Sequence, residues 1–554
     1  MFGPYKNTTE DSEKYQKVYL PKVEAYRKKL DDAILDEYKL ADDLIPTSTG
    51  IDVTKIPDGS MTKEELEIIN LTGCKLAEKI ASGEYTSVTV FKAYAKRATM
   101  AHQLTNCAME LFTDEGLKRA EELDEYFKKN GKTVGFLHGL PVSLKEHYDY
   151  KGRITHAGYV AYIDRVSEEW CLTSKCLYDQ GAVFYIRTTE PQCLMHLCSN
   201  NNITGKCLNP TNTSLTPGGS SSGEGALAAM KGSVFGLGSD IGGSIRCPAA
   251  FNGVWGLRPT QKRVSMINCF SACSYKDQEA VSCVLGPLAR SAEDIDLFMK
   301  SIIACKPWEI DSNLIPLPWK GLSDVDPKTL TIAIDWDDGV VKPTPPMIRG
   351  LKLAKEKLEA AGVTVVDWKA IDVEKYVNTC YSMYNADSNK AQKASLALSG
   401  EPVLKLSEVC LSFGCGDDGC SVDEYQKLAG TRNEGRIAYE AAMQANKIDF
   451  ILSPTYCSVA AKPETIKYWG YTNLWNVLDF PNVIFPTGLS VDPSLDAPDT
   501  SYVTRSEIEE YEYKLYNDAE EFKGAPINLQ LTGKRWFDED VVSASKIVAE
   551  IISA

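Results

Sequence analysis

Residues 218–244 read GGSSSGEGALAAMKGSVFGLGSDIGGS, and this stretch decides the fold class of the chain. Nine of its 27 residues are glycine and six are serine, a composition that a flexible linker would also have. A linker would not contain the helix-forming segment EGALAAMKG, nor continue directly into the apolar segment PAAFNGVWGL. In a folded α/β core, clustered glycines let the backbone approach a ligand or aim several N–H groups at one charge. The stretch therefore predicts a binding or catalytic loop within a folded domain.

Two nucleotide-binding motifs can be tested against the glycines of this chain. A phosphate-binding loop is excluded, because the GKT sequence at 131–133 has Tyr126 where the motif needs its first glycine. A dinucleotide fingerprint is excluded as well, because Gly236 and Gly238 are followed by Ile241 in place of the third glycine. The glycines therefore serve a different chemistry.

Residues 219–223 match the GxSxG elbow of α/β-hydrolases, which place the catalytic histidine after the serine. All five histidines precede Ser221, so that interpretation fails: His102, His138, His147, His156 and His196. A serine nucleophile without a histidine can use a lysine whose pKa burial lowers by several units from about 10.4. Lys145 is the candidate, because it lies in the strand-like segment GLPVSLKE. The alternative is a lysine that solubilises an edge strand, and the two interpretations carry equal weight here.

The composition is that of an ordinary globular protein of 554 residues, with 44% hydrophobic and 25% charged residues. Such a length gives either three or four domains or one large α/β enzyme. The net charge of −16 argues against a nucleic-acid or anionic-membrane partner, because both bind clustered cations. No run reaches 18 apolar residues, so we expect no membrane span, and the polar N-terminus does not resemble a secretory signal.

Seventeen cysteines are scattered along the chain. Without a secretory signal, we expect reduced thiols in a cytoplasmic protein. The closest group is Cys410, Cys415 and Cys420, but its spacing does not fit a zinc site and no histidine follows His196. We therefore expect an ordinary loop there and no metal site in the chain.

Hydrophobic spacing predicts an alternation of helices and short strands, which is typical of α/β proteins. The predicted helical segments are 15–40, 60–71, 86–104 and 114–130. The predicted strands are 139–146, 182–188, 329–335, 363–368, 449–454 and 482–488. No repeat and no Pro/Ser linker divides the chain. We predict a helical N-terminal extension over residues 1–75 and one catalytic α/β domain over residues 76–554.

Three motifs at matching separations carry a resemblance to a known family. GLPVSLKE at 139–146, PGGSSSGEGALAA at 217–229 and GLGSDIGGSIRCPAAFNGVWGLRPT at 236–260 resemble the amidase signature family. The similarity covers roughly residues 75–545 and includes GPLARSAEDI, DFILSPT and GAPINLQLTG. LTNCAMELF and SNNNITGKCLNP look most like the fungal acetamidase-type enzymes and, more distantly, fatty acid amide hydrolase. The resemblance implies an amidase-signature fold, in which helices cover both faces of a large mixed β-sheet.

The family pattern implies a Ser–Ser–Lys triad at three positions of this chain. Lys145 would be the base, Ser220 the bridging serine beside a cis peptide bond, and Ser244 the nucleophile. The backbone N–H groups implied to form the oxyanion hole are those of Ile241, Gly242, Gly243 and Ser244. Substrate contacts are also implied for Ser220 and Leu194. Supporting positions around the triad are implied for Asp240, Arg246, Gly218 and Gly219.

The chain departs from the family pattern at two positions. Ser222 stands in a glycine slot, and Ser239 stands where the family commonly has threonine. Neither departure falls on the triad, and we expect neither to contact it. His147 and His196 lie near the motifs and are expected to pack or to form hydrogen bonds, with a role in specificity as the alternative.

The resemblance implies hydrolysis of small carboxylic amides, acetamide-like, to an acid and ammonia through an acyl-enzyme. Short carbamate esters such as urethane present the same carbonyl group. Hydrolysis of longer acyl or aryl amides is the alternative, and a non-catalytic member of the family is the rival from another class. No cofactor is implied. The expected partner is the small-molecule amide or carbamate, and a homodimer is the candidate assembly.

Overall fold

The structure is a computed structural model that describes residues 12–272, 278–416 and 418–554. Residues 1–11, which hold most of the segment that argued against a secretory signal and the start of the predicted extension, lie outside the described residues. Within the described residues, no helix is long and apolar enough to cross a membrane. This agrees with the absence of long apolar runs in the sequence.

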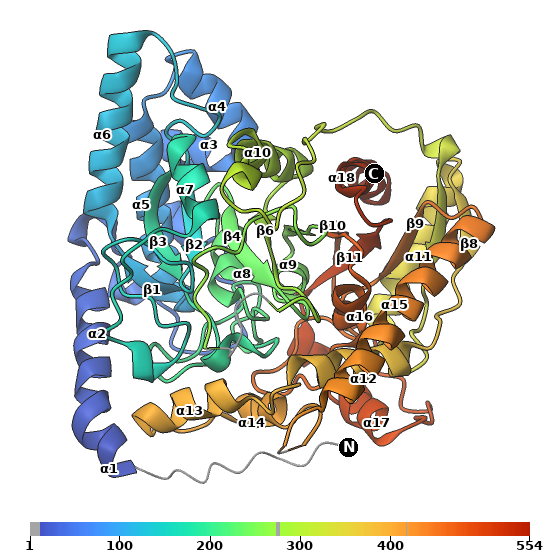
Figure 1. Cartoon of the computed structure of the whole chain (residues 1–554). Coiled ribbons are helices and arrows are strands. Elements are labelled where there is room, and N and C mark those ends of the chain that lie inside the picture. Colours follow the sequence, from blue (N-terminus) through green and yellow to red (C-terminus); the bar gives the residue numbers. More distant parts are fainter. Residues whose placement is uncertain (1–11, 273–277, 417) are drawn as a thin grey trace.

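One mixed sheet of eleven strands forms the centre of the molecule, in the order β1-β3-β2-β4-β6-β5-β10-β11-β9-β7-β8 (Figure 1). The strands are β1 (Ala108–Leu111), β2 (Pro141–Lys145), β3 (Val183–Thr188), β4 (Gly236–Asp240), β5 (Trp255–Arg258), β6 (Val284–Ala289), β7 (Thr331–Ile334), β8 (Thr364–Asp367), β9 (Phe450–Pro454), β10 (Asn482–Ser490) and β11 (Pro526–Thr532). The first six in sequence form one side of the sheet and the last five form the other. Their boundary is the antiparallel pair of β5 and β10. The predicted fold class is confirmed.

Eighteen α-helices surround this sheet in the described residues. Before β4 they are α1 (Ser12–Lys14), α2 (Leu20–Asp32), α3 (Lys63–Asn70), α4 (Gly73–Ala81), α5 (Ser87–Thr105), α6 (Thr113–Asn130), α7 (Leu172–Asp179) and α8 (Ser222–Ala229). After β4 they are α9 (Arg246–Phe251), α10 (Ala292–Ala304), α11 (Pro345–Ala360), α12 (Val373–Tyr384), α13 (Lys390–Ser399), α14 (Lys405–Leu411), α15 (Val422–Ala445), α16 (Gly470–Leu478), α17 (Glu507–Lys514) and α18 (Asp538–Ser553).

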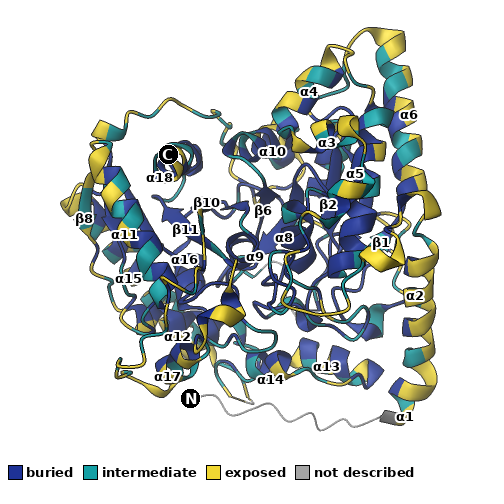
Figure 2. Cartoon of the chain, turned by 180° about the vertical axis from the view of Figure 1, so that it is seen from behind, coloured by how far each residue is buried: buried dark blue, intermediate teal, exposed yellow. Residues whose placement is uncertain are grey.

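The helices enclose the sheet in two groups. Helices α8 and α9 contact each other and pack on β4, β5, β10 and β11, while α10, α11 and α18 form a second connected group on β5, β6, β10 and β11. Figure 2 shows the strands between them as buried and the outer faces of α2, α6 and α11 as exposed. Burial on both faces explains why the predicted strands read as short continuous apolar runs.

The N-terminal segment differs in detail from the predicted helix over 15–40. It contains a π-helical turn, Tyr15–Tyr19, and then α2, which has a proline in its first turn and ends at Asp32. Helix α2 contacts the main body of the fold, because the Tyr26 hydroxyl lies 3.3 Å from His156 Nε2. The predicted boundary at residue 75 falls inside α4, and the division into two domains stays a prediction.

The central strands bring the motifs of the sequence together. Strand β2 pairs in parallel with both β3 and β4, so the carboxyl ends of the three strands lie at one edge of the sheet. Lys145 ends β2, and Asp240 ends β4 directly before the loop 241–245. Catalytic groups commonly gather at this edge of α/β sheets. The topology therefore places Lys145 and the glycine-rich loop side by side.

Candidate active site

Lys145 is fully buried at the end of β2. Its Nζ donates a hydrogen bond of 2.6 Å to Ser220 Oγ and one of 3.0 Å to Ser239 Oγ. The alternative of an edge-strand lysine is wrong, because β2 has a neighbouring strand on each side. The sequence therefore folds so that a cationic side chain is enclosed next to two serine hydroxyls.

Burial lowers the pKa of the Lys145 amine from 10.5 to about 8. The cause is desolvation, which penalises the ammonium form, and the negative charges of nearby acidic groups oppose it only in part. The groups whose ionised forms act in that opposite direction are Glu190, Cys283, Asp240 and Glu224. At neutral pH a useful fraction of the amine is therefore uncharged and able to accept a proton.

Ser220 lies on a tightly packed turn. The Gly219–Ser220 peptide bond is cis, as the resemblance implied. A Cβ on Gly219 would approach Cys198 O to 2.2 Å, and Gly218 has a φ of +79°, a conformation that favours glycine. Both glycines are thus required by the backbone around Ser220. The turn leads directly into α8, and it places Ser220 Oγ 2.6 Å from Lys145 Nζ.

Ser244 lies at the end of the loop that follows β4, and its side chain is buried. Its carbonyl accepts a hydrogen bond of 3.0 Å from the N–H of Ser221, which ties the two serine segments together. Its own hydroxyl makes no hydrogen bond with any part of the chain that the structure describes. A hydroxyl in this state is free to engage a substrate.

The structure distinguishes among the four backbone N–H groups that the resemblance assigned to the oxyanion hole. The N–H of Gly243 donates to Asp240 Oδ1 at 2.9 Å and is therefore already engaged. The N–H groups of Ile241, Gly242 and Ser244 have no acceptor among residues 12–272, 278–416 and 418–554. These three N–H groups are therefore the ones that could donate to an acceptor outside the described residues.

Two side chains that sequence reasoning missed fix the orientation of this loop. The Tyr384 hydroxyl, from the end of α12, donates to the carbonyl of Ile241, and Thr472 Oγ1, from α16, donates to the carbonyl of Gly242 at 2.6 Å. Because a peptide unit is planar, holding the Ile241 carbonyl also fixes the direction of the Gly242 N–H. No local sequence signal links these positions, which lie 143 and 230 residues from their partners.

Asp240 and Arg246 brace the same loop from inside. Asp240 accepts hydrogen bonds from the N–H groups of Gly243 and Ile245, and its carboxylate pairs with Arg246 at 2.9 Å. Burial raises the pKa of Asp240, but the charge and hydrogen bonds of Arg246, with a hydrogen bond from Asn476, outweigh it and leave the pKa below its usual value. Asp240 is therefore ionised and holds the loop as a fixed acceptor.

Ser239 corrects one expectation from the sequence. We expected this departure from the family pattern not to contact the triad, yet its hydroxyl accepts a hydrogen bond from Lys145 Nζ. Ser239 is on β4, the parallel neighbour of β2, and its hydroxyl lies 3.0 Å from Lys145 Nζ. Serine and threonine both carry a hydroxyl, so Ser239 still provides Lys145 with a second hydrogen-bond partner. The other departure, Ser222, begins α8 and its hydroxyl faces the Cys198 carbonyl at 3.5 Å.

The other predicted residues are buried or half-buried. Leu194 is in a short turn with a φ of +60° and is half-buried. His147 Nδ1 lies 3.2 Å from the Phe270 carbonyl, and burial holds the pKa of His147 well below its usual value. Burial also lowers the pKa of His196 to about 3. Both rings are therefore neutral at physiological pH, and their roles in specificity stay predictions.

The cysteine-rich loop differs from expectation. Cys415 and Cys420 form a disulfide, with their Cα atoms 5.4 Å apart, so the expectation of reduced thiols is wrong for this pair. The five-residue separation allows the chain to turn and bring the two sulfur atoms together. Cys410 does not join them, because its thiol donates to the carbonyl of Met195.

Comparisons with known proteins agree with this geometry. A family model described as Amidase matches residues 89–542. The chain is 42% identical to a putative amidase of Schizosaccharomyces pombe over 94% of this chain and 97% of that protein, and 36% identical to an acetamidase of Emericella nidulans over 95% and 97%. Among solved structures, a fatty acid amide hydrolase matches with a TM-score of 0.96 and 47% identity, covering all of this chain and 98% of that one. The chain therefore belongs to the amidase signature family, and it is a hydrolase that acts on amides.

Proposed function

We propose that this chain hydrolyses small aliphatic amides, acetamide-like, to a carboxylic acid and ammonia, and that it also cleaves short carbamate esters such as urethane. The observation that carries the proposal is the fully buried Lys145, whose lowered pKa and 2.6 Å hydrogen bond to Ser220 Oγ suit a base. The acetamidase of Emericella nidulans supports the choice of a short acyl group.

The reaction begins with a proton relay. Uncharged Lys145 accepts the proton of Ser220 as Ser220 accepts that of Ser244, and Ser244 Oγ attacks the amide carbonyl carbon. Negative charge collects on the carbonyl oxygen, where the free N–H groups of Ile241, Gly242 and Ser244 stabilise it. Ser220 then returns a proton to the leaving nitrogen, because an amide anion is too basic to leave.

The second half of the reaction uses the same groups. Ammonia leaves an acyl group esterified to Ser244, and water then attacks this ester as the relay accepts its proton. The tetrahedral intermediate collapses to the acid, and Ser244 recovers its proton. All protons return to their starting atoms, so no metal or cofactor is needed in the scheme.

A longer acyl chain is the second candidate, and a specific observation favours it. The structure that matches with a TM-score of 0.96 is that of a fatty acid amide hydrolase. Aryl amides form part of the same alternative. A non-catalytic role is the least favoured of the three functions, because Lys145, Ser220 and Ser244 are all present and Lys145 Nζ forms a hydrogen bond with Ser220 Oγ.

The deciding experiment measures ammonia release from primary amides of increasing acyl length, with ethyl carbamate assayed through its alcohol product. We expect kcat/KM to be highest for two to four carbons, and a maximum beyond eight carbons would select the alternative. Ser244→Ala is the blank. A fluorophosphonate reagent should label Ser244, and an adduct on Ser221 or Ser222 would refute the assigned nucleophile.

A cytoplasmic location and a homodimer belong to the same proposal and rest on the sequence alone. Fractionation of the cells that express the chain tests the first. Light scattering of the purified chain at micromolar concentration tests the second, with a mass near twice 61.1 kDa as the expected result.

A further inference from the structure

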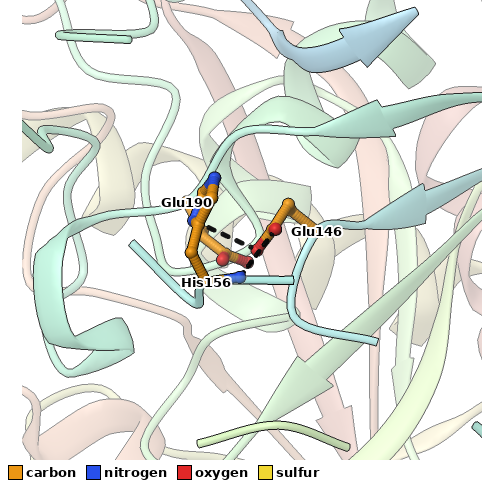
Figure 3. A group of neighbouring side chains, drawn as sticks. All are labelled: Glu146, His156 and Glu190. Atoms are coloured by element: carbon orange, nitrogen blue, oxygen red, sulfur yellow. Dashed lines mark hydrogen bonds and ion pairs between the residues drawn. The ribbon is translucent and has the colours of Figure 1, made fainter. Parts of the chain in front are cut away.

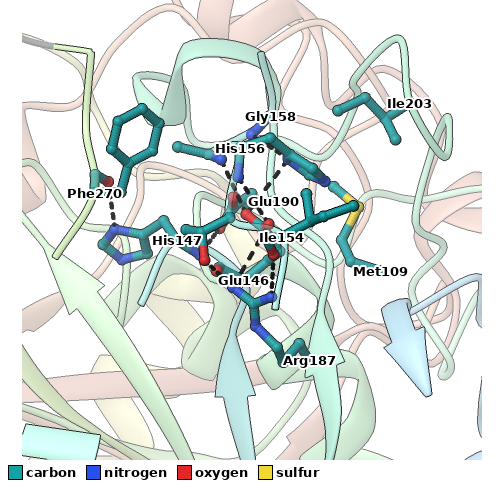
Figure 4. A network of polar contacts seen from close by, with 12 residues as sticks. Met109, Glu146, His147, Ile154, His156, Gly158, Arg187, Glu190, Ile203 and Phe270 are labelled. Carbon is teal, nitrogen blue, oxygen red and sulfur yellow. Dashed lines mark hydrogen bonds and ion pairs between the residues drawn. The ribbon is translucent and has the colours of Figure 1, made fainter. Parts of the chain in front are cut away.

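A cluster of buried titratable side chains lies directly behind Lys145. Glu146, His156 and Glu190 are fully buried, and their polar atoms lie within 4.8 Å of one another. Figure 3 shows the three side chains pointing toward a common centre. Figure 4 shows Arg187 on one side of Glu146, while His147 turns away toward Phe270. The proposed reaction uses none of these groups, and two carboxyl groups so close together in a buried site need an explanation.

A metal ion does not fit this cluster. The Arg187 guanidinium is 3.6 Å from Glu146 Oε1 and supplies a positive charge where a cation would bind. The two oxygens of Glu146 also accept hydrogen bonds of 2.9 Å from the backbone N–H groups of His156 and Ala157. The protein therefore already balances the negative charge of Glu146 and supplies hydrogen bonds to both of its oxygens.

The two carboxyl groups have unequal surroundings. Glu146 has the guanidinium and two short N–H bonds, whereas Glu190 Oε2 accepts one long bond, 3.3 Å, from the N–H of His147. Glu190 Oε1 has no donor within the described residues. Two adjacent carboxylates cannot both ionise without water, so the one with fewer donors keeps the proton.

The direction of each pKa agrees with this assignment. Burial and the neighbouring Glu146 raise the pKa of Glu190 well above its usual value. Burial opposes the ionisation of Glu146, but His156, Arg187 and a hydrogen bond from Glu190 outweigh it, and the pKa of Glu146 is lowered. The pair therefore holds one proton, on Glu190, and one negative charge, on Glu146.

The place of this proton matters because Glu190 adjoins the base. Lys145 pairs with Thr188 across the parallel strands β2 and β3, and the carboxyl group of Glu190 reaches the backbone of His147, two residues beyond Lys145. An ionised carboxylate in this position would favour the ammonium form of Lys145. A neutral carboxyl group would not.

We propose that Glu190 is a positioning residue that presents a protonated, uncharged carboxyl group to Lys145, and that Glu146 keeps the proton on it by holding the negative charge beside Arg187. The inference rests on the proposed role of Lys145 as the base. The charged or titratable groups around Lys145 are Glu190, Cys283, Asp240, Glu224 and His147. Those around the pair of Glu146 and Glu190 are Arg187, His156, Glu110 and Tyr26. Among the groups around Lys145, Glu190 would have the largest electrostatic influence on the lysine if Glu190 were ionised.

Three variants test the proposal through the pH dependence of kcat/KM. Glu190→Gln keeps a neutral group in place, so the midpoint of the profile should stay within about 0.3 pH unit of wild type. Glu146→Gln removes the charge that keeps the proton on Glu190, so Glu190 ionises and the midpoint should rise by about one to three units. The double variant should return the midpoint to the wild-type position. Glu401→Gln replaces a fully buried carboxyl group elsewhere and is the matched control, with no shift expected.

Two results would overturn the proposal. A midpoint lowered by a unit or more in Glu190→Gln would mean that Glu190 is an ionised partner of Lys145. If Glu146→Gln folds and its midpoint does not move, the two carboxyl groups do not share a proton as proposed. If Glu146→Gln does not fold, infrared difference spectra decide: wild type minus Glu190→Gln at pH 7 must show the band of a buried neutral carboxylic acid, and its absence refutes the inference.

The proposed role of Lys145 is tested apart from this inference. Lys145→Met should be inactive at every pH, and if it is active the proposed mechanism fails. The infrared band of Glu190 does not depend on activity. An inactive Lys145→Met together with an absent band would therefore refute the shared proton while leaving the mechanism in place.

Discussion

The pH dependence of catalysis gives the sharpest test of the mechanism. With the pKa of Lys145 at about 8, roughly one tenth of the amine is uncharged at pH 7 and about nine tenths at pH 9. An unperturbed lysine, with a pKa of 10.5, would be uncharged in only about three molecules of ten thousand at pH 7. Burial of Lys145 therefore increases the active fraction at pH 7 by about 300-fold.

The assay follows ammonia release from acetamide at low substrate concentration, where the rate reports kcat/KM of the free enzyme. We expect kcat/KM to rise about tenfold between pH 7 and pH 9 through one ionisation and then to reach a plateau. Lys145→Ala should lose most activity together with this rise. Lys145→Arg should not restore it, because a guanidinium stays charged. A flat profile in the wild type, or an active Lys145→Arg enzyme with an unchanged profile, would refute the assignment.

The same pKa has a consequence for stability, whose sign follows from proton binding. The folded chain binds the Lys145 proton less tightly than the unfolded chain, so stability is lost as the pH falls from 10.5 to about 8 and the loss is complete below that. The difference between a pKa of 10.5 and one of about 8 corresponds to a loss of about 3 kcal/mol. Lys145→Met should therefore gain stability relative to wild type at pH 7, and the gain should shrink toward pH 10. Urea unfolding at the two pH values measures it.

Three further substitutions follow from the loop and its supports. Gly243→Ala should abolish ammonia release, because a Cβ there would lie 2.5 Å from Thr472 Oγ1 and the backbone has a φ of +130°. The control is Gly430→Ala, in an open position on α15, which should keep full activity. Asp240→Asn should lower the free energy of unfolding by about 3–5 kcal/mol, because it leaves a buried arginine without its carboxylate. Since the pKa of Asp240 is lowered in the fold, urea titrations should show the deficit above pH 3.8 and its loss in stronger acid. Ser239→Ala should lower kcat/KM by up to about tenfold, whereas Ser239→Thr keeps the hydroxyl and should keep the wild-type value. Equal values for the two variants would show that the hydrogen bond from Lys145 does not contribute to catalysis.

The sequence predicted six strands, as short runs of branched and aromatic residues between turn residues, and it missed β1, β4, β5, β6 and β11. Strand β4 shows most clearly why a strand can escape prediction. That strand reads GLGSD, which has no apolar pattern, because its glycines make room for neighbouring groups. A Cβ on Gly236 would overlap Glu224 at 1.5 Å, and one on Gly238 would lie 2.5 Å from Leu288. The strand is therefore defined by close packing from other elements, and composition alone predicts a loop.

The proposed triad positions come from the family resemblance, which rests on motifs that are each continuous in sequence, whereas the groups that support the loop have no such motif. Tyr384 and Thr472 reach the loop from helices far along the chain, and their side chains carry no sequence signal of their own. The hydrogen bond of 2.9 Å from the Gly243 N–H to Asp240 Oδ1 likewise depends on the exact path of the loop. Such contacts depend on how the helices pack on the sheet, which local patterns do not determine.

The antiparallel pair of β5 and β10 divides the sheet into an early and a late half of the chain. Lys145, Ser220 and Ser244 all come from the early half, but the loop before Ser244 is held by Tyr384, Thr472 and, through Asp240, Asn476 from the late half. During synthesis on the ribosome, the reactive groups therefore emerge well before the residues that organise them. A nascent chain that ends before α12 carries Lys145, Ser220 and Ser244 but none of these three supports. On the proposed mechanism, we therefore expect hydrolysis to begin only after the two halves of the molecule have joined.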